Sequence, residues 1–278
     1  MEFTDIEYMA SEGVATIWLN RPGRLNAVRA STLDELLSAL DRADADDGIR
    51  AVIVSGRGRA FCAGTDLADG FRLPEGGDPA SGDGVHPDLG GRVTLRLYEM
   101  VKPVIGAING PAVGFGATFP LAMDFRLAST DAKFGYVFTR RGIVAESCSS
   151  WFLPRIVGVG TALDWMLTGR MIQAGEAMEK GLVQELLAPD ALMARAEEIA
   201  RDIAANTAAM SVAMNRQLLW KLLDADHPRR AHELESRGLA AALAGPDSRE
   251  GAASFAEKRA PAFTGKASDA SFMRTWWA

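Results

Sequence analysis

The sequence predicts an α/β fold with an all-helical C-terminal region. Over the first two thirds of the chain, short apolar segments with the length of buried strands alternate with segments whose apolar residues recur at helical spacing. Beyond residue 200 only the helical spacing remains. The 278 residues, 48% of them hydrophobic, suffice for a large core. We therefore expect an α/β core over residues 1–199 and a helical region over residues 200–278.

The N-terminal residues carry the patterns of a hairpin, a helix and a buried strand. Residues 3–8 and 14–19 contain many β-forming residues and flank a polar turn. Ser31 or Thr32 is suited to cap a helix whose leucines at positions 33, 36, 37 and 40 share one face. Residues 51–55 are apolar without alternation, which is typical of a parallel strand buried on both faces.

Two glycine-rich bends each follow an apolar strand. The first bend, residues 56–67, follows the strand at 51–55, and the second bend, residues 109–116, follows a strand at 104–108. Glycine lets the backbone turn so that main-chain N–H groups face a ligand. If the bends meet in space, their N–H groups can converge on one carbonyl oxygen as an oxyanion hole. A dinucleotide-binding turn is the competing interpretation of Gly114-x-Gly116, but Phe119 stands where its third glycine belongs.

The other segments continue the alternation of strands and helices. Residues 69–91 hold seven glycines and three prolines and are expected to form a loop, either a surface insertion or a lid. The remaining expected elements are helices at 93–101, 117–123, 151–157 and 161–167, strands at 125–129 and 183–187, an apolar segment at 133–138, a loop at 140–150, a helical turn at 175–180, and helical stripes within 192–203 and 210–222.

Composition excludes several classes of function. A net charge of −6 argues against nucleic acid as the main partner. No apolar run approaches the roughly 20 residues that span a bilayer, so no membrane partner is expected. Cys62 and Cys148 match no disulfide framework or metal-ligand spacing, and no metal site is expected. Because the sequence starts without a charged and apolar leader, the expected location is the cytoplasm.

The two bends and several other segments carry a resemblance to a known family. The sequences AFCAGTDL at residues 60–67 and KPVIGAINGPAVGFG at residues 102–116 resemble the crotonase (enoyl-CoA hydratase/isomerase) superfamily, and further matches extend along nearly the whole chain. The resemblance implies a spiral of repeated ββα units, a C-terminal helical trimerisation region and acyl-CoA thioesters as substrates. It also implies a homotrimer, or a hexamer built from two trimers, and no cofactor beyond the CoA of the substrate.

Position by position, the resemblance also implies a set of site residues. It puts the two oxyanion N–H groups on Thr65 and Phe115, which requires no particular side chain at either position. The CoA and the acyl group are expected to contact residues of both bends and of the loop after the hairpin, together with two C-terminal residues that often serve a neighbouring subunit. These contact residues are Arg24, Leu25, Ala27, Ala63, Gly64, Asp66, Leu67, Gly114, Phe138, Phe255 and Lys258.

The catalytic acid is expected in the loop at residues 142–150. The two glutamates with which a hydratase of this superfamily handles water correspond to Thr118 and Phe138, and neither residue is a general base. The loop resembles the one that carries a single catalytic carboxylate in Δ3,Δ2-enoyl-CoA isomerases, which assigns that role to Glu146. One carboxylate suits double-bond isomerisation, and an apolar acyl pocket would raise its pKa.

Several alternatives stay open at this point. Glu146 is either the base or a solvated or helix-capping acid, and Cys148 is a packing residue or a nucleophile, although no histidine lies nearby in sequence to activate it. Other reactions are hydration by Glu146 alone, or a related hydrolase or ring-forming reaction. A non-catalytic acyl-CoA-binding protein is the alternative of a different class.

Overall fold

A six-stranded sheet forms the centre of the α/β part, in a computed structural model that describes residues 3–67 and 87–277. The first two strands form the expected hairpin, and the other four are all parallel to the second. The predicted α/β core is therefore confirmed. In sheet order the strands are β1 (Ile6–Ser11), β2 (Val14–Leu19), β3 (Ala51–Gly56), β4 (Val104–Ile108), β6 (Phe125–Ser129) and β9 (Glu185–Leu187).

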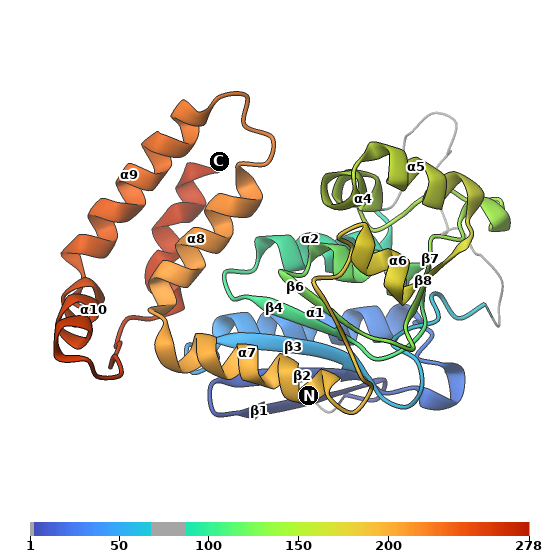
Figure 1. The fold of residues 1–278 in the computed structure, drawn as a ribbon, viewed down its shortest axis with the longest axis horizontal. Helices are drawn as coiled ribbons and strands as arrows, with labels where there is room; N and C mark the ends of the chain where they lie inside the picture. The colour runs from blue at the N-terminus through green and yellow to red at the C-terminus, as the bar shows by residue number, and fades with distance from the viewer. Residues whose placement is uncertain (1–2, 68–86, 278) are drawn as a thin grey trace.

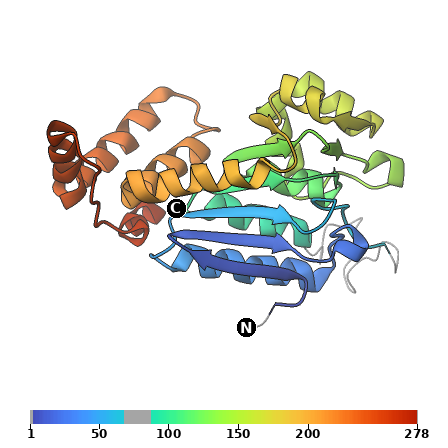
Figure 2. The same cartoon turned by 60° about the horizontal axis from the view of Figure 1, so that its bottom comes forward.

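Helices cover both faces of this sheet. Alternate residues of β3 face opposite sides, so Val52 and Val54 join one core cluster while Ala51 and Ile53 join another. The first cluster includes side chains of α1 (Ala30–Ala45) and α2 (Leu89–Glu99), and the second includes side chains of α7 (Leu192–Asn206). Figure 2 shows α7 along one face of the sheet and α1 along the other. Burial on both faces explains why β3 is apolar at successive positions.

Two helix starts differ from the prediction. Helix α1 begins at Ala30, so Thr32 lies inside its first turn, where its hydroxyl accepts a hydrogen bond from the Arg29 N–H at 3.2 Å. Helix α2 begins at Leu89 and not at residue 93, because Asp88 caps it by accepting from the Gly91 N–H. The end of the predicted loop at 69–91 is therefore helical. Residues 69–86 of that loop lie outside the described residues, and its role as a lid or an insertion stays a prediction.

A smaller layer packs beside the main sheet and begins within the second bend. The expected helix at 117–123 is two short turns, because Pro120 has no N–H with which to continue an α-helix. Strand β8 was not expected, and the apolar segment expected at 133–138 forms a strand as far as Gly135. The elements of this layer are β5 (Ala112–Val113), β7 (Lys133–Gly135), β8 (Met171–Gln173), α3 (Phe115–Thr118), α4 (Ser149–Val157), α5 (Val159–Thr168), α6 (Ala174–Glu179) and the 3₁₀ turns η2 (Phe119–Ala122) and η3 (Thr139–Arg141), while η1 (Pro22–Arg24) follows the hairpin.

The C-terminal residues are helical, as predicted. Figure 1 shows α8, α9 and α10 at one end of the molecule, with α4 and α5 at the other. Pro228 and Pro246 lie in the first turns of α9 and α10, where the missing N–H costs no hydrogen bond. The predicted division at residue 199/200 falls inside α7. The C-terminal elements are α8 (Ala209–Lys221), α9 (Pro228–Ala244), α10 (Pro246–Glu257) and the 3₁₀ segment η4 (Ala267–Trp276).

Helix α8 is attached to the core through the C-terminal end of α2. The buried Arg216 guanidinium donates to the carbonyls of Leu97, at 2.8 Å, and of Met100, and it pairs with Asp124 at 2.8 Å. Gln217 Nε2 also donates to the Met100 carbonyl, at 2.6 Å. These carbonyls lie in and just beyond the last turn of α2, where the helix itself offers them no donor. Arg216 and Gln217 therefore fix the end of α2 to the C-terminal helices.

The described part of the chain gives no sign of a membrane segment or a metal site. None of its helices combines the length and hydrophobicity needed to cross a bilayer. It also contains no group of three or more histidine, cysteine, aspartate or glutamate side chains arranged to hold a metal ion.

Candidate active site

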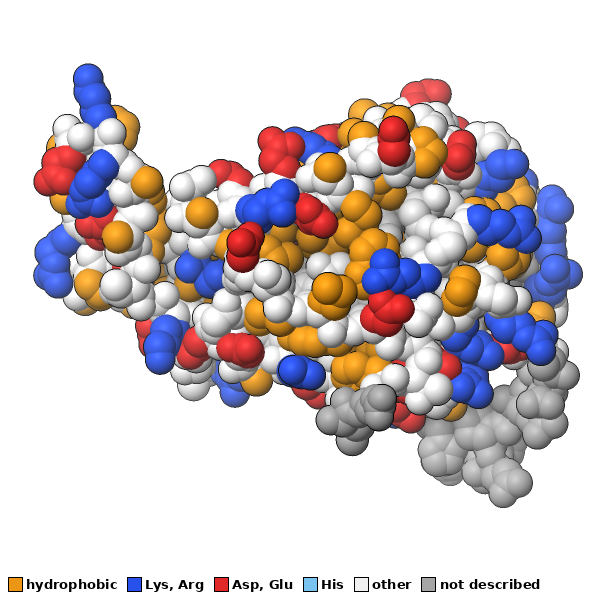
Figure 3. Space-filling view, turned by 90° about the horizontal axis from the view of Figure 1, so that it is seen from below, with side chains coloured by type: hydrophobic (Ala, Val, Ile, Leu, Met, Phe, Trp, Pro, Cys, Tyr) orange, Lys and Arg blue, Asp and Glu red, His pale blue; other side chains and the backbone are white. Residues whose placement is uncertain are grey.

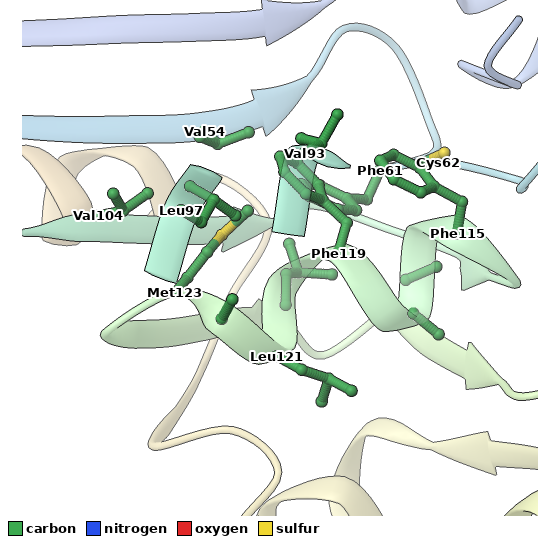
Figure 4. Packing of buried hydrophobic residues seen from close by; sticks show 14 of the residues in the cluster. Val54, Phe61, Cys62, Val93, Leu97, Val104, Phe115, Phe119, Leu121 and Met123 are labelled. Carbon is green, nitrogen blue, oxygen red and sulfur yellow. The ribbon is translucent and has the colours of Figure 1, made fainter. Parts of the chain in front are cut away.

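The two glycine-rich bends lie against each other. The Cys62 N–H donates to the Pro111 carbonyl at 3.1 Å, and the Val113 N–H donates to the Cys62 carbonyl at 2.9 Å. Figure 4 shows Phe61 and Cys62 of the first bend beside Phe115 at the end of the second. The two segments, which lie about 50 residues apart in the sequence, therefore meet in space, which is the condition for the predicted oxyanion hole.

Glycine is required where the bends touch. A Cβ on Gly116 would lie 2.1 Å from the Cys62 carbonyl oxygen, and one on Gly64 would lie 2.8 Å from the Val113 carbonyl oxygen. Gly64 also has φ +95° and Gly114 has φ +54°, which L-residues rarely adopt. The spacing of these glycines thus allows two backbones to approach within contact distance.

The N–H groups of Thr65 and Phe115 point away from the hydrogen bonds that hold the bends. Thr65 and Val28 form a parallel β-bridge, in which Val28 donates to the Gly64 carbonyl and accepts from the Asp66 N–H. The N–H of Thr65 itself therefore points away from Val28. Phe115 is the first residue of α3, where an N–H has no intrahelical acceptor. Within residues 3–67 and 87–277, neither N–H has a hydrogen-bond acceptor. An oxyanion hole requires two free N–H groups that can donate to the same oxygen atom. The two bends supply the free N–H groups, and the oxyanion hole itself stays a prediction.

Glu146 lies over the same turn of helix. Thr118, one turn after Phe115, donates its hydroxyl to Glu146 Oε1 at 2.7 Å, and Ser147 donates its hydroxyl to Oε2. Burial raises the pKa of Glu146, the hydrogen bonds from Ser147 and Thr118 oppose that rise, and the negative charge of Asp88 adds to it. The predicted base is therefore bonded to a buried threonine that lies one helical turn after Phe115.

The loop that presents Glu146 has an unusual backbone. Ser147 and Cys148 have φ of +54° and +55°, and a non-glycine residue in this region costs about 1–3 kcal/mol. The Ser149 hydroxyl donates to the Glu146 carbonyl at 2.6 Å, and the Ser147 N–H donates to Asp88 Oδ1 at 3.2 Å. These bonds hold the loop in a shape that directs Glu146 toward α3.

Helix α2 closes the other side of Glu146. A Cβ on Gly90 would lie 2.3 Å from Glu146 Oε2 and equally close to the Ser147 hydroxyl. The sequence prediction missed Gly90, Asp88 and Ser147 as neighbours of the acid and treated Thr118 only as a lost glutamate. A possible helix cap at Asp88, ahead of the periodic apolar residues Val93 and Leu97, was the signal that could have placed the start of α2 here.

The structure groups most of the residues expected to bind CoA and separates two of them. Leu25 accepts a hydrogen bond from the Ala63 N–H at 3.0 Å, and Asp66 pairs with Arg21 at 3.0 Å. Phe255 and Lys258 lie at α10, at the opposite end of the molecule from α4 (Figure 1). Their role therefore stays a prediction that requires a second copy of the chain. The segments 24–27 and 63–67 run side by side, Gly114 adjoins Gly64, and Phe138 is buried before η3.

Both cysteines have environments that favour the neutral thiol. Burial raises the pKa of Cys62 to about 12, and burial together with the charges of Asp88 and Glu146 raises the pKa of Cys148. Because the thiolate is the nucleophile, these environments favour packing roles.

The chain is similar to known proteins over most of its length. The family model described as enoyl-CoA hydratase/isomerase matches residues 9–266. Enoyl-CoA hydratase ACTT3 of Alternaria alternata is 39% identical over 91% of this chain and 83% of its own length. The 1,2-epoxyphenylacetyl-CoA isomerase of Escherichia coli K12 is 35% identical over 92% of this chain and 96% of its own.

A solved structure has the same fold. The crystal structure of enoyl-CoA hydratase from Bacillus anthracis superposes with a TM-score of 0.85, is 31% identical and covers 95% of this chain and 100% of that one. The match of the family model, the similar relatives and this structural likeness agree with the crotonase-type fold predicted from the sequence. The chain is an enzyme of the enoyl-CoA hydratase/isomerase family.

Proposed function

We propose that this enzyme moves the double bond of an enoyl-CoA thioester from the 3-position to the 2-position, with Glu146 as the only proton carrier. The observation that carries the proposal is the hydrogen bond from Thr118 to Glu146, which places one carboxylate over the turn that starts with the Phe115 N–H. The two positions at which a hydratase would supply glutamates hold Thr118 and the buried Phe138. A 1,3-proton shift needs one carboxylate.

The reaction is a proton abstraction followed by a proton return. The Glu146 carboxylate takes a proton from the α-carbon, and the C–H electron pair enters an enolate whose oxygen accepts from the N–H groups of Thr65 and Phe115. The enolate is conjugated with the double bond, so the electrons shift toward the γ-carbon. The Glu146 carboxyl then gives the proton to the γ-carbon, and the carboxylate is restored.

The environment of Glu146 supports its role as a base. A general base works best when its pKa is near the working pH, and burial raises the pKa of this carboxyl. The negative charge of Asp88 raises the pKa further, whereas the hydrogen bonds from the hydroxyls of Ser147 and Thr118 stabilise the carboxylate and lower the pKa.

Glu146→Gln tests the proposal. The amide keeps the size of the side chain and cannot accept the α-proton, so conversion of 3-enoyl-CoA to the conjugated 2-enoyl-CoA should fall by about 10²–10⁴-fold. The measurement is ultraviolet absorbance of the conjugated thioester. Glu235→Gln, at an exposed position of α9, is the matched control and should retain wild-type rates. An isomerisation rate that is unchanged in Glu146→Gln would exclude Glu146 as the base.

Hydration is the second candidate, because relatives such as the Alternaria protein are named hydratases. In that reaction Glu146 would take a proton from water and the absorbance of 2-enoyl-CoA would fall. Offering 2-enoyl-CoA with water as the sole co-substrate separates the two reactions. Tight binding of both thioesters without turnover would instead indicate a binding protein.

A further inference from the structure

The Thr118 hydroxyl has two hydrogen-bond acceptors within reach. It lies 2.7 Å from Glu146 Oε1 and 3.3 Å from the carbonyl oxygen of Phe115, and its side chain is fully buried. A hydroxyl group carries one proton, so it can donate to only one of these oxygens at a time. Its oxygen can also accept a hydrogen bond.

We propose that Thr118 is a positioning residue that bonds to Glu146 in both of its protonation states. When Glu146 is ionised, Thr118 donates to Oε1. When Glu146 carries a proton on Oε1, its O–H donates to the Thr118 oxygen, and the Thr118 proton turns to the Phe115 carbonyl. The Glu146 side chain thus stays in the same position when it changes from base to acid. The catalytic part of this inference rests on the proposed function.

Ser147 differs from Thr118 in this respect. Its hydroxyl donates to Glu146 Oε2, and within the described residues it has no second acceptor. Protonation of Oε2 would therefore leave the Ser147 proton without an acceptor in a buried place, which is unfavourable. Protonation of Oε1 leaves every hydrogen bond of the pair satisfied. The geometry thus favours Oε1 as the atom that holds the proton.

The proton that Glu146 removes from the substrate is the proton that it returns. The proton that leaves the α-carbon binds Oε1, its electron pair remains in the enolate, and the same proton forms the new bond at the γ-carbon. Between the two steps the hydrogen bond to Thr118 holds the acid proton and slows its exchange with solvent. An α-deuterated substrate should therefore give product that carries deuterium at the γ-carbon.

Thr118→Val tests the inference, because valine keeps the shape and removes the hydroxyl. The carboxylate loses a charge-assisted hydrogen bond, so the acidic limb of the pH–rate profile should move to higher pH and kcat at neutral pH should fall about tenfold or more. Transfer of deuterium to the γ-carbon should also decrease. Thr118→Ser should restore both properties. Thr94→Val is the matched control, because the buried Thr94 hydroxyl has no hydrogen-bond partner among the described residues.

A direct titration separates this inference from the proposed reaction. In protein with ¹³C-labelled glutamate, the carboxyl signal that is absent from Glu146→Gln reports the Glu146 pKa without turnover. That pKa should rise in Thr118→Val and return in Thr118→Ser. The role of Thr118 would be overturned if the Glu146 pKa were unchanged in Thr118→Val. It would also be overturned if the rate fell while the acidic limb of the pH–rate profile stayed in place. If the valine variant does not fold, Thr118→Ala provides the same readouts. Full isomerase activity in Glu146→Gln would refute the reaction alone.

Discussion

Gly116 shows how tightly one residue controls the candidate oxyanion hole. It faces the Cys62 carbonyl at a distance that excludes any side chain, and it directly follows Phe115. Its neighbours are backbone atoms of the first bend, which cannot rotate out of the way. The position therefore requires glycine although its φ is ordinary.

Gly116→Ala should separate the two bends. The added methyl group would push the Cys62 carbonyl away, which costs about 1–3 kcal/mol of stability. It would also disturb the predicted convergence of the N–H groups of Thr65 and Phe115. Loss of one oxyanion donor lowers kcat by about 10²–10³-fold. Thermal unfolding and kcat are the measurements. Gly160→Ala, in the open start of α5, is the control and should be neutral or slightly stabilising. Normal kcat in Gly116→Ala would contradict the convergence of the bends.

At this scale the sequence predicts the residues whose signal is local. The two bends follow from glycine spacing, and Glu146 follows from the resemblance of its loop to that of Δ3,Δ2-enoyl-CoA isomerases. Thr118 and Gly90 were missed as neighbours of Glu146 because the contact joins segments that lie 28 and 56 positions from it. No local pattern at Thr118 distinguishes a hydrogen-bond partner from a packing residue.

Helix α2 is the element that connects the site to the C-terminal helices. Its first turn lies against Glu146 through Gly90, and its last carbonyls accept hydrogen bonds from Arg216 and Gln217. Two glycines in the first turn each disfavour a helix by roughly 1 kcal/mol relative to alanine. Capping by Asp88 and burial of Val93 and Leu97 offset that cost.

Arg216→Ala should weaken the whole fold. The substitution leaves the Asp124 carboxylate without its guanidinium partner and deprives the Leu97 carbonyl of its Arg216 donor. The Met100 carbonyl also loses its Arg216 donor but keeps the hydrogen bond from Gln217. Breaking a buried ion pair in this way costs about 3–5 kcal/mol. Urea unfolding gives the change in the free energy of unfolding. Arg201→Ala removes an exposed pair with Glu197 and should cost less than about 1 kcal/mol. Equal losses in the two variants would show that Arg216 does not anchor α2.

The elements predicted best are those with a long periodic pattern or a continuous apolar run. The leucine face of α1 and the buried strand β3 are examples, because burial alone explains both. Strand β8 has three residues and pairs with β7 at the edge of the smaller sheet, so its sequence carries too short a pattern. The start of α2 was placed late because glycine and proline near residue 90 are typical of loops.

At the scale of the molecule, the C-terminal helices expose apolar side chains beside a groove. Leu219 of α8 is 74% exposed, and the groove of about 730 Å³ next to it is lined by Phe125, Ile203 and Trp220, among others. Figure 3 shows hydrophobic side chains gathered over the middle of one face of the molecule. The predicted trimer or hexamer would cover such surface.

Light scattering tests the predicted oligomer. The wild-type particle should have about three or six times the 29.7 kDa mass of one chain. Leu219→Asp places a charge on the apolar surface and should shift the mass toward that of a single chain. Val144→Asp, at an exposed position in the loop before Glu146, should leave the mass unchanged. A wild-type mass of 29.7 kDa would refute the oligomer.

The attachment of α2 at both of its ends restricts insertions and deletions within this helix. A helix that is held at both ends fixes the number of residues between those ends. Each residue of an α-helix turns it by about 100°, so one inserted residue between Gly90 and Met100 would rotate one contact away from its partner. Exposed positions such as Leu95 tolerate exchange of the side chain, but the length of this segment does not. An insertion between Gly90 and Met100 is therefore expected to impair catalysis.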